Sequence, residues 1–198
     1  MTDETAQAVP KIRSEGGRAA APHRVLSAME TARGIDAPAA TVAKPLIRLF
    51  GGRVGRELRG RRLGHPLHPL AVTVPIGAWV CSALLDLVPG SDAAARRLVG
   101  IGLLAVAPAA VLGAADYSEL DERQRRVGFG HLVLNSLGAA FFTGSYLRRR
   151  REPVGGKILG VVGLVVLSAG GALGGHLAYA QGAGVFRWQS PRPQAVDR

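Results

Sequence analysis

The chain has 198 residues, enough for one domain, and a formal net charge of +11. Its apolar residues make up 47% of the total and are concentrated in long runs, not spread at the periods of soluble helices or strands. Basic residues flank these runs, where they orient membrane spans and meet anionic lipid, which argues against a nucleic-acid-binding domain with a basic folded surface. The sequence therefore predicts an integral membrane protein that contacts lipid and binds no nucleic acid.

The N-terminal part of the chain is polar and divides into two segments. Residues 1–43 are rich in Ala, Gly, Pro, Glu and Arg without an apolar period, which predicts a disordered tail. Residues 44–62 alternate arginines with apolar residues at a spacing of four, which predicts a basic amphipathic segment on the membrane surface. These apolar residues are Leu46, Phe50, Val54 and Leu58. We expect no secretory signal peptide, because the first long apolar run begins far from Met1.

Four apolar runs follow, each near the length at which a helix crosses about 30 Å of hydrocarbon. They cover residues 69–87, 98–115, 127–147 and 158–179. Because the connections are short, neighbouring helices are expected to be antiparallel. Residues 63–185 therefore predict an all-α, integral membrane, antiparallel four-helix bundle, followed by a short C-terminal tail at 186–198. No convincing internal repeat is visible.

Basic residues near the helix ends predict the orientation of the bundle. The end that carries both termini has more of them, although the run Arg148–Arg151 at the other end narrows the difference. We expect a multi-pass protein of a bacterial inner membrane with both termini in the cytoplasm. Arg148–Arg151 is expected to end the third helix and to meet headgroups, and Cys81 to serve as a small hydrophobic residue.

Four histidines are expected at the end of the bundle that carries the termini. Because alternate helices reverse direction, His65, His68, His131 and His176 should lie at a similar depth. Ionisable groups inside hydrocarbon are costly without partners, so such residues are candidates for a functional site. Neutral imidazole is a ligand for haem iron and for other transition metals. We therefore expect these histidines to bind one b-type haem or a transition-metal ion.

Three polar residues are expected to support the histidines. Asp116 and Glu119 follow the second span at the same end, and Asn135 lies four residues after His131 on the same helical face. Hydrogen bonds from such groups orient ligating imidazoles. Asp116 is also a candidate direct ligand.

Simpler explanations compete with a ligand site. His131 could donate to a backbone carbonyl of a neighbouring helix, and histidines at the interface could be hydrated. His65 and His68 share a helical face only if the helix begins before Pro66. Small residues before His176 would admit a flat macrocycle, but close helix packing is the favoured interpretation. These are Gly170, Gly171, Gly174 and Gly175, and core packing is likewise expected for Pro75 and Trp79.

Four motifs in residues 63–185 resemble the bacterial family called domain of unknown function 2231. They are Gly64-His65-Pro66-Leu67-His68-Pro69, Asp116-Tyr117-Ser118-Glu119-Leu120, the stretch from Arg126 to His131, and Gly174-Gly175-His176-Leu177. The resemblance implies a four-helix membrane protein, in a family with some members fused or adjacent to Rieske-type iron–sulfur domains and grouped by fold with two-haem cytochromes. No such domain follows Val185, so any iron–sulfur partner is expected to be a separate soluble protein. Histidines at one end favour one haem over two.

Three functions remain open from the sequence. The favoured hypothesis is a redox or electron-transfer subunit that binds one haem or metal. The alternatives are a proton or ion transport protein and a non-catalytic membrane anchor for a partner. We assign no enzyme activity, because the sequence contains no nucleophile elbow, phosphate loop or zinc-protease signature.

Overall fold

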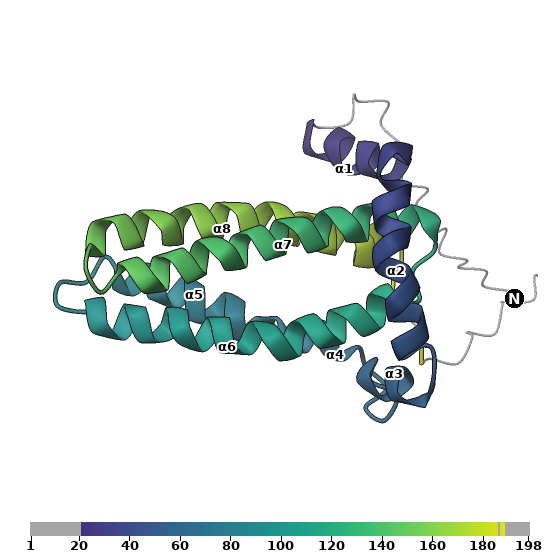
Figure 1. Cartoon of the computed structure of the whole chain (residues 1–198), viewed down its shortest axis with the longest axis horizontal. Coiled ribbons are helices and arrows are strands. Elements are labelled where there is room, and N and C mark those ends of the chain that lie inside the picture. The colour runs from purple at the N-terminus through teal and green to yellow at the C-terminus, as the bar shows by residue number, and fades with distance from the viewer. Residues whose placement is uncertain (1–20, 186, 189–198) are drawn as a thin grey trace, which may run out of the picture.

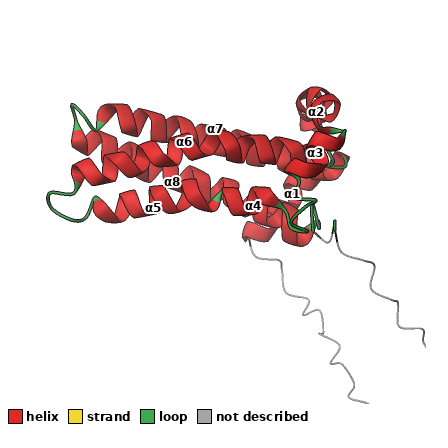
Figure 2. Ribbon diagram, turned by 90° about the horizontal axis from the view of Figure 1, so that it is seen from below, coloured by secondary structure: helices red, strands yellow, loops and turns green. Residues whose placement is uncertain are grey.

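The structure, a computed structural model, describes residues 21–185, 187 and 188. Within these residues the secondary structure is entirely helical. Four long helices lie side by side, and shorter helices gather at one end (Figures 1 and 2). The elements are α1 (Ala21–Thr31), the 3-10 helix η1 (Arg33–Ile35), α2 (Asp36–Phe50), α3 (Arg53–Leu58), α4 (Leu67–Ala71), α5 (Thr73–Leu85), α6 (Asp92–Tyr117), α7 (Glu122–Arg148), α8 (Pro153–Gly175) and the π-helix η2 (His176–Ala180).

The four predicted spans are confirmed. Within the described residues, four helical segments are long and apolar enough to cross a membrane: Leu67–Leu85, Asp92–Tyr117, Glu122–Arg148 and Pro153–Ala180. The shortest, formed by α4 and α5 together, has 19 residues and rises about 28 Å at 1.5 Å per residue. The other three extend beyond the predicted runs at both ends, because charged residues such as Asp92 and Glu122 begin the helices outside the apolar stretches.

Successive helices run in opposite directions. Hydrogen bonds between the first two spans join His68 to Ala109, Trp79 to Val99 and Ser82 to Ala95. The residue number increases along the first span as it decreases along the second, so the two spans are antiparallel. The α5–α6 and α7–α8 connections lie at one end of the bundle, which we call the far end. The α6–α7 turn and the N-terminal helices lie at the other, which we call the site end (Figure 1).

The middle of the bundle is closed by an aromatic pair. The Trp79 ring stacks on Phe142 with ring centres 4.1 Å apart and planes 4° from parallel. Both side chains are buried, as predicted for Trp79, and each lies against a glycine of a neighbouring helix. A Cβ at Gly102 would collide with the indole, and one at Gly163 would lie 2.9 Å from the Phe142 ring. Glycine at these two positions therefore lets the helices close around the rings.

The far end contains a buried ion pair that corrects one expectation. The Arg149 guanidinium donates to both carboxylate oxygens of Asp86, at 2.5 and 2.6 Å, and to Ser145 Oγ at 3.1 Å. Only 4% of the Arg149 side chain is exposed, although the run Arg148–Arg151 was expected to meet headgroups as a whole. Its neighbour Arg150 is exposed, so the helix turns one arginine of the run inward to an acidic partner.

The N-terminal helices form a collar at the site end. The sequence predicted disorder through residue 43, but the chain is helical from Ala21, whereas residues 1–20 lie outside the described residues. Helix α2 lies across the ends of α6 and α7 (Figures 1 and 2). Its buried residues are Ala39, Ala43 and Phe50. Ala43 packs with Tyr117 and Leu120, and the Tyr117 hydroxyl donates to the Ala39 carbonyl oxygen. A face built largely from alanine gives little hydrophobic periodicity, which explains the wrong prediction.

The predicted surface segment at 44–62 is divided between elements. Helix α2 ends at Phe50, and α3 starts after Gly51 and Gly52. Lys44 and Arg48 on α2 are exposed, so this helix carries a basic face opposite its buried one. The C-terminal segment returns to the site end, where Trp188 donates to the carbonyl oxygen of Arg59 at 3.3 Å. Residues 186 and 189–198 of the predicted C-terminal tail lie outside the described residues.

Candidate functional site

Two of the four predicted histidines face each other inside the bundle. His68 is the second residue of α4, and His131 lies nine residues after the start of α7. Their ring centres are 6.3 Å apart, and the ring planes are nearly perpendicular, at 86°. Residues far apart in the sequence thus form one imidazole pair, which we call the histidine pair.

Each imidazole of the pair is held by a backbone carbonyl of another helix. His68 Nδ1 lies 3.0 Å from the oxygen of Ala109 on α6, and His131 Nδ1 lies 2.8 Å from the oxygen of Gly170 on α8. A carbonyl only accepts hydrogen bonds, so each neutral ring must carry its proton on Nδ1. Both Nε2 atoms then present a lone pair, and neither has a hydrogen-bond partner among the described residues. All four spans contribute to this arrangement.

Glycines provide the surfaces against which the two rings lie. A Cβ at Gly113 would lie 2.9 Å from the His68 ring, and one at Gly174 would lie 2.7 Å from the His131 ring. Gly170 lies against Asn135, whereas a Cβ at Gly171 or at Gly175 would meet open space. The expected close packing at the Gly170–Gly175 stretch is therefore packing of side chains from α7 against α8.

Asn135 lies next to the histidine pair, where the sequence predicted it. Its Nδ2 donates to the carbonyl oxygen of His131 at 2.7 Å and lies 3.1 Å from His131 Nδ1. The i, i+4 spacing on α7 produces this contact. Asn135 therefore limits the movement of the His131 ring on the side of α7.

His65 is not part of the pair. Helix α4 begins at Leu67, after Pro66 in an extended conformation, so His65 precedes the helix and is exposed. Gly64, with φ of +66°, forms the turn before it. The expectation that His65 and His68 share a helical face is wrong because the helix begins after Pro66.

His176 lies at the same end but faces the collar. Its Nε2 is 2.5 Å from Oε1 of Glu30 on α1, and both side chains are over nine-tenths buried. The other carboxylate oxygen of Glu30 pairs with Arg123. Burial raises the pKa of Glu30, but hydrogen bonds from Arg123 and His176 outweigh it and hold the pKa below its ordinary value. No sequence signal identified Glu30, because it lies in the segment interpreted as disordered.

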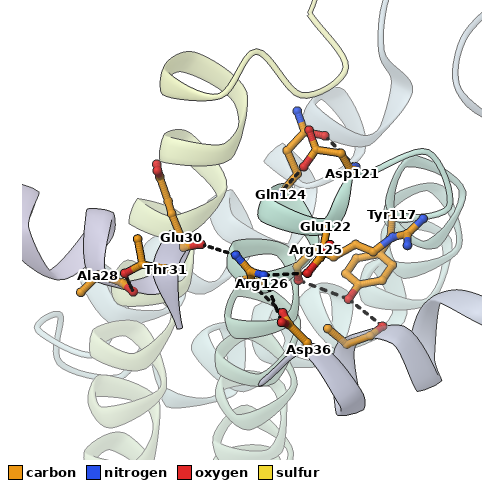
Figure 3. Close-up of polar contacts among 11 residues, drawn as sticks. Ala28, Glu30, Thr31, Asp36, Tyr117, Asp121, Glu122, Gln124, Arg125 and Arg126 are labelled. Atoms are coloured by element: carbon orange, nitrogen blue, oxygen red, sulfur yellow. Dashed lines mark hydrogen bonds and ion pairs between the residues drawn. The ribbon is translucent and has the colours of Figure 1, made fainter. Parts of the chain in front are cut away.

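A second acidic residue of the collar binds α7 close by. Asp36 accepts from Arg126 at 2.5 and 3.0 Å, and Arg126 also donates to the backbone oxygen of Glu30 at 2.9 Å (Figure 3). The Arg126 guanidinium lowers the pKa of the Asp36 carboxyl. Glu122 approaches the same guanidinium at 2.8 Å. Ion pairs thus fasten the collar to the first turns of α7.

Asp116 and Glu119 do not contact the histidines. Asp116 pairs with Arg187 at 2.8 Å, and Glu119 pairs with Arg59 at 2.7 Å and with Arg187 at 3.0 Å. The Arg59 side chain is 2% exposed and also donates to the carbonyl oxygen of Ala115. Burial lowers the pKa of Arg59, while the Glu119 carboxylate opposes this effect. These carboxylates bind arginines from the segments that precede and follow the bundle. They do not orient a histidine, as the sequence analysis expected.

Within the described residues, no group of three or more His, Cys, Asp or Glu side chains is arranged to hold a metal ion. The histidine pair would supply two nitrogen ligands to a metal ion. Cys81 is exposed, on the outside of the bundle, and is separate from the pair.

Comparison with known proteins identifies the family. The family described as "Predicted membrane protein (DUF2231)" matches residues 64–187, which cover all four spans and the histidine pair. The chain belongs to the DUF2231 family. No curated protein and no solved structure matches the chain significantly. The collar helices α1–α3, with Glu30 and Asp36, precede the matched region.

Proposed function

We propose that the protein is a membrane electron-transfer subunit that binds a single metal centre between His68 and His131. The centre is the iron of one b-type haem or another transition-metal ion. The observation that supports this proposal is the facing pair of imidazoles, each with Nδ1 bound to a carbonyl and Nε2 uncommitted. A metal-binding histidine usually donates its other N–H to a carbonyl or carboxylate in this way.

The separation of the rings fits two ligands of one ion. With metal–nitrogen bonds of about 2.0–2.1 Å, imidazoles on opposite sides of an ion have ring centres about 6 Å apart. The observed separation is 6.3 Å. A bound transition metal would supply one-electron redox chemistry. The Ala109 and Gly170 carbonyls would hold both rings in the tautomer that leaves Nε2 free for the metal, and the four spans would surround the centre.

The location of the pair suits electron exchange at one membrane face. His68 is the second residue of the first span, the Trp79–Phe142 stack lies in the middle of the bundle, and the Asp86–Arg149 ion pair lies at the far end. The redox partner would be a separate soluble protein, such as an iron–sulfur protein, that docks at the site end. The greater basic charge there favours a cytoplasmic location for both termini in a bacterial inner membrane.

The test is an absorption spectrum with metal analysis of full-length protein purified in detergent from haem- and metal-replete cells. A haem gives a Soret band that shifts on reduction, and another metal gives a stoichiometric elemental signal. His68→Ala and His131→Ala should each remove the signal, whereas the matched control His65→Ala should keep it. A colourless, metal-free wild-type protein would overturn the proposal, and so would a ligand that survives both substitutions in the pair.

A further inference from the structure

The two parallel spans α4–α5 and α7 contact each other through three pairs of residues along the bundle. His68 faces His131, Trp79 stacks on Phe142, and Asp86 pairs with Arg149. In each pair the second residue lies 63 positions after the first (131 − 68, 142 − 79 and 149 − 86). Two fully buried serines, Ser82 and Ser145, have the same spacing.

The contacts that these residues make within their own hairpins are also duplicated. His68 reaches the Ala109 oxygen and lies against Gly113, and His131 reaches the Gly170 oxygen and lies against Gly174. The second-helix residues of the two sets are 61 positions apart (170 − 109 and 174 − 113). Both of these contacts of His68 therefore have a counterpart at His131.

The same spacing of 61 positions recurs at two places nearer the far end of the bundle. Gly102 lies against Trp79 as Gly163 lies against Phe142. The Ser82 hydroxyl donates to the Ala95 oxygen at 2.9 Å, and the Ser145 hydroxyl donates to the Gly156 oxygen at 2.6 Å.

Basic residues at the far end follow this pattern too. Arg96 on α6 donates to the Tyr146 oxygen at 3.1 Å, and Lys157 on α8 donates to the Asp86 oxygen at 3.4 Å. Each cation thus crosses from the second helix of its own hairpin to a carbonyl near the end of the other hairpin's first helix. The difference between spacings of 63 and 61 lies in the connections, since residues 86–91 join the first two helices and residues 149–152 join the last two.

We infer that the transmembrane domain is an internal duplication of one helical hairpin, with a pseudo-two-fold axis that runs along the bundle between the facing pairs. The first hairpin is Leu67–Tyr117 and the second is Glu122–Ala180. This inference differs from the sequence analysis, in which no convincing internal repeat was visible. Most matched positions differ in identity, as Trp79 and Phe142 do, and the equivalence becomes visible only through contacts.

The duplication has a consequence for the ligand, which rests on the proposed function. Histidines related by a two-fold axis would bind a ligand in equivalent ways, so His68 and His131 would be matched ligands of the metal. Gly113 and Gly174 then occupy equivalent positions against the His68 and His131 rings. At the far end the matched positions have diverged to opposite charges, Asp86 and Arg149, which makes the two hairpins complementary.

Exchange of the far-end charges tests the duplication without reference to any ligand. Asp86→Arg or Arg149→Asp alone should lower the thermal unfolding temperature of the full-length protein strongly. The double exchange should restore most of the loss, because Ser82 lies four residues before position 86 as Ser145 lies four residues before Arg149. An exchanged protein as unstable as the single variants would overturn the inference.

Substitutions of Ser82 and Ser145 test whether these two positions are equivalent. In the native protein Ser145→Ala should cost more than Ser82→Ala, since only Ser145 also accepts from Arg149. In the exchanged protein Ser82→Ala should cost more than Ser145→Ala, because the arginine at position 86 can then donate to Ser82. An unchanged order would show that the two positions are not equivalent.

Paired glycine substitutions test the matched roles of His68 and His131 separately. Gly113→Ala and Gly174→Ala should lower the bound haem or metal by similar factors, and the control Gly171→Ala, which meets open space, should not. Loss in only one of the two would contradict the matched-ligand arrangement. If the wild type binds nothing, the proposed function fails, while the charge exchange still decides the duplication.

Discussion

The two ends of the bundle use polar side chains in opposite ways. At the far end, Asp86 and Arg149 satisfy each other through two hydrogen bonds, and Ser145 accepts a third bond from the guanidinium. At the site end, His68 and His131 each satisfy one nitrogen with a carbonyl and leave the other uncommitted. Both pairs join the first span to the third, so position alone does not separate a structural pair from a candidate ligand site.

This contrast gives a criterion for interpreting polar residues inside a membrane. A buried ion pair with all its hydrogen bonds made has no capacity for a ligand, and its removal affects folding. An imidazole with a fixed tautomer and a free Nε2 keeps that capacity. Substitutions at the far end should therefore change stability, and substitutions at the site end should change ligand binding.

The largest loss of stability is expected from Arg149→Ala. It leaves the Asp86 carboxylate buried without its partner, and breaking a buried pair in this way costs about 3–5 kcal/mol. Unfolding of the purified protein by heat or by denaturing detergent measures the effect. The neighbouring exposed residue provides the control, because Arg150→Ala should change the stability by less than about 0.5 kcal/mol. Equal losses of stability in Arg149→Ala and Arg150→Ala would contradict a structural role for the far-end ion pair.

A comparable loss is expected from Trp79→Ala at the boundary between the two ends. Truncation of a buried tryptophan to alanine costs about 3–5 kcal/mol, because it leaves a cavity beside Phe142 and Gly102. Trp79→Phe should recover part of the loss, since a phenyl ring still stacks on Phe142. The control Leu104→Ala removes a side chain that is 79% exposed on α6 and should have little effect. The two substitutions are compared by thermal unfolding in one detergent.

Much of the bundle was predictable from the sequence, and the reason is physical. Apolar runs long enough to cross hydrocarbon specify spans, and short turns specify antiparallel neighbours, so all four helices were found. The shared depth of His68 and His131 followed from alternating helix direction. The same argument did not show which way a ring points, so it included the exposed His65 and the collar-facing His176.

The features that the sequence did not reveal depend on specific pairing between distant segments. Glu30 acquires its role only when α1 packs beside Arg123 and His176. Arg149 looks like its neighbours in an arginine run until the helix phase turns it toward Asp86. Asp116 and Glu119 were expected near the histidines, but they pair with Arg187 and Arg59, which lie outside the four spans.

A smaller effect is expected from acidification, and it should be confined to the site end. The hydrogen bonds from Arg123 and His176 hold the pKa of Glu30 below its ordinary value of 4.5. Ionised Glu30 therefore stabilises the docked collar at pH values above 4.5, and this contribution is lost as the pH falls through the lowered pKa. Glu30→Gln should remove about 1.5–3 kcal/mol of docking free energy and flatten the pH dependence.

A fluorophore on the collar measures this docking. Ala28 is exposed on α1, so it can be labelled as Ala28→Cys in a Cys81→Ala background, and anisotropy reports detachment as the pH is lowered from 7 to 3. The control is Glu152→Gln, which removes an exposed pair with Arg148 at the far end. A collar that stays docked at low pH in both proteins would show that apolar contacts, such as those of Phe50, are sufficient.

The smallest change in stability, with a clear change in ligand binding, is expected from Asn135→Ala. The substitution removes one hydrogen bond, from Nδ2 to the His131 oxygen, which is worth about 1 kcal/mol. It also frees the His131 ring on the side of α7, and loss of such an orienting group typically weakens metal binding by about 10–100-fold. Titration of metal or haem into ligand-free protein measures the affinity. Ser136→Ala, at the exposed neighbouring position, is the matched control. A loss of stability without a loss of affinity would place Asn135 with the structural residues of the far end, and the contrast between the two ends would then depend on the histidines alone.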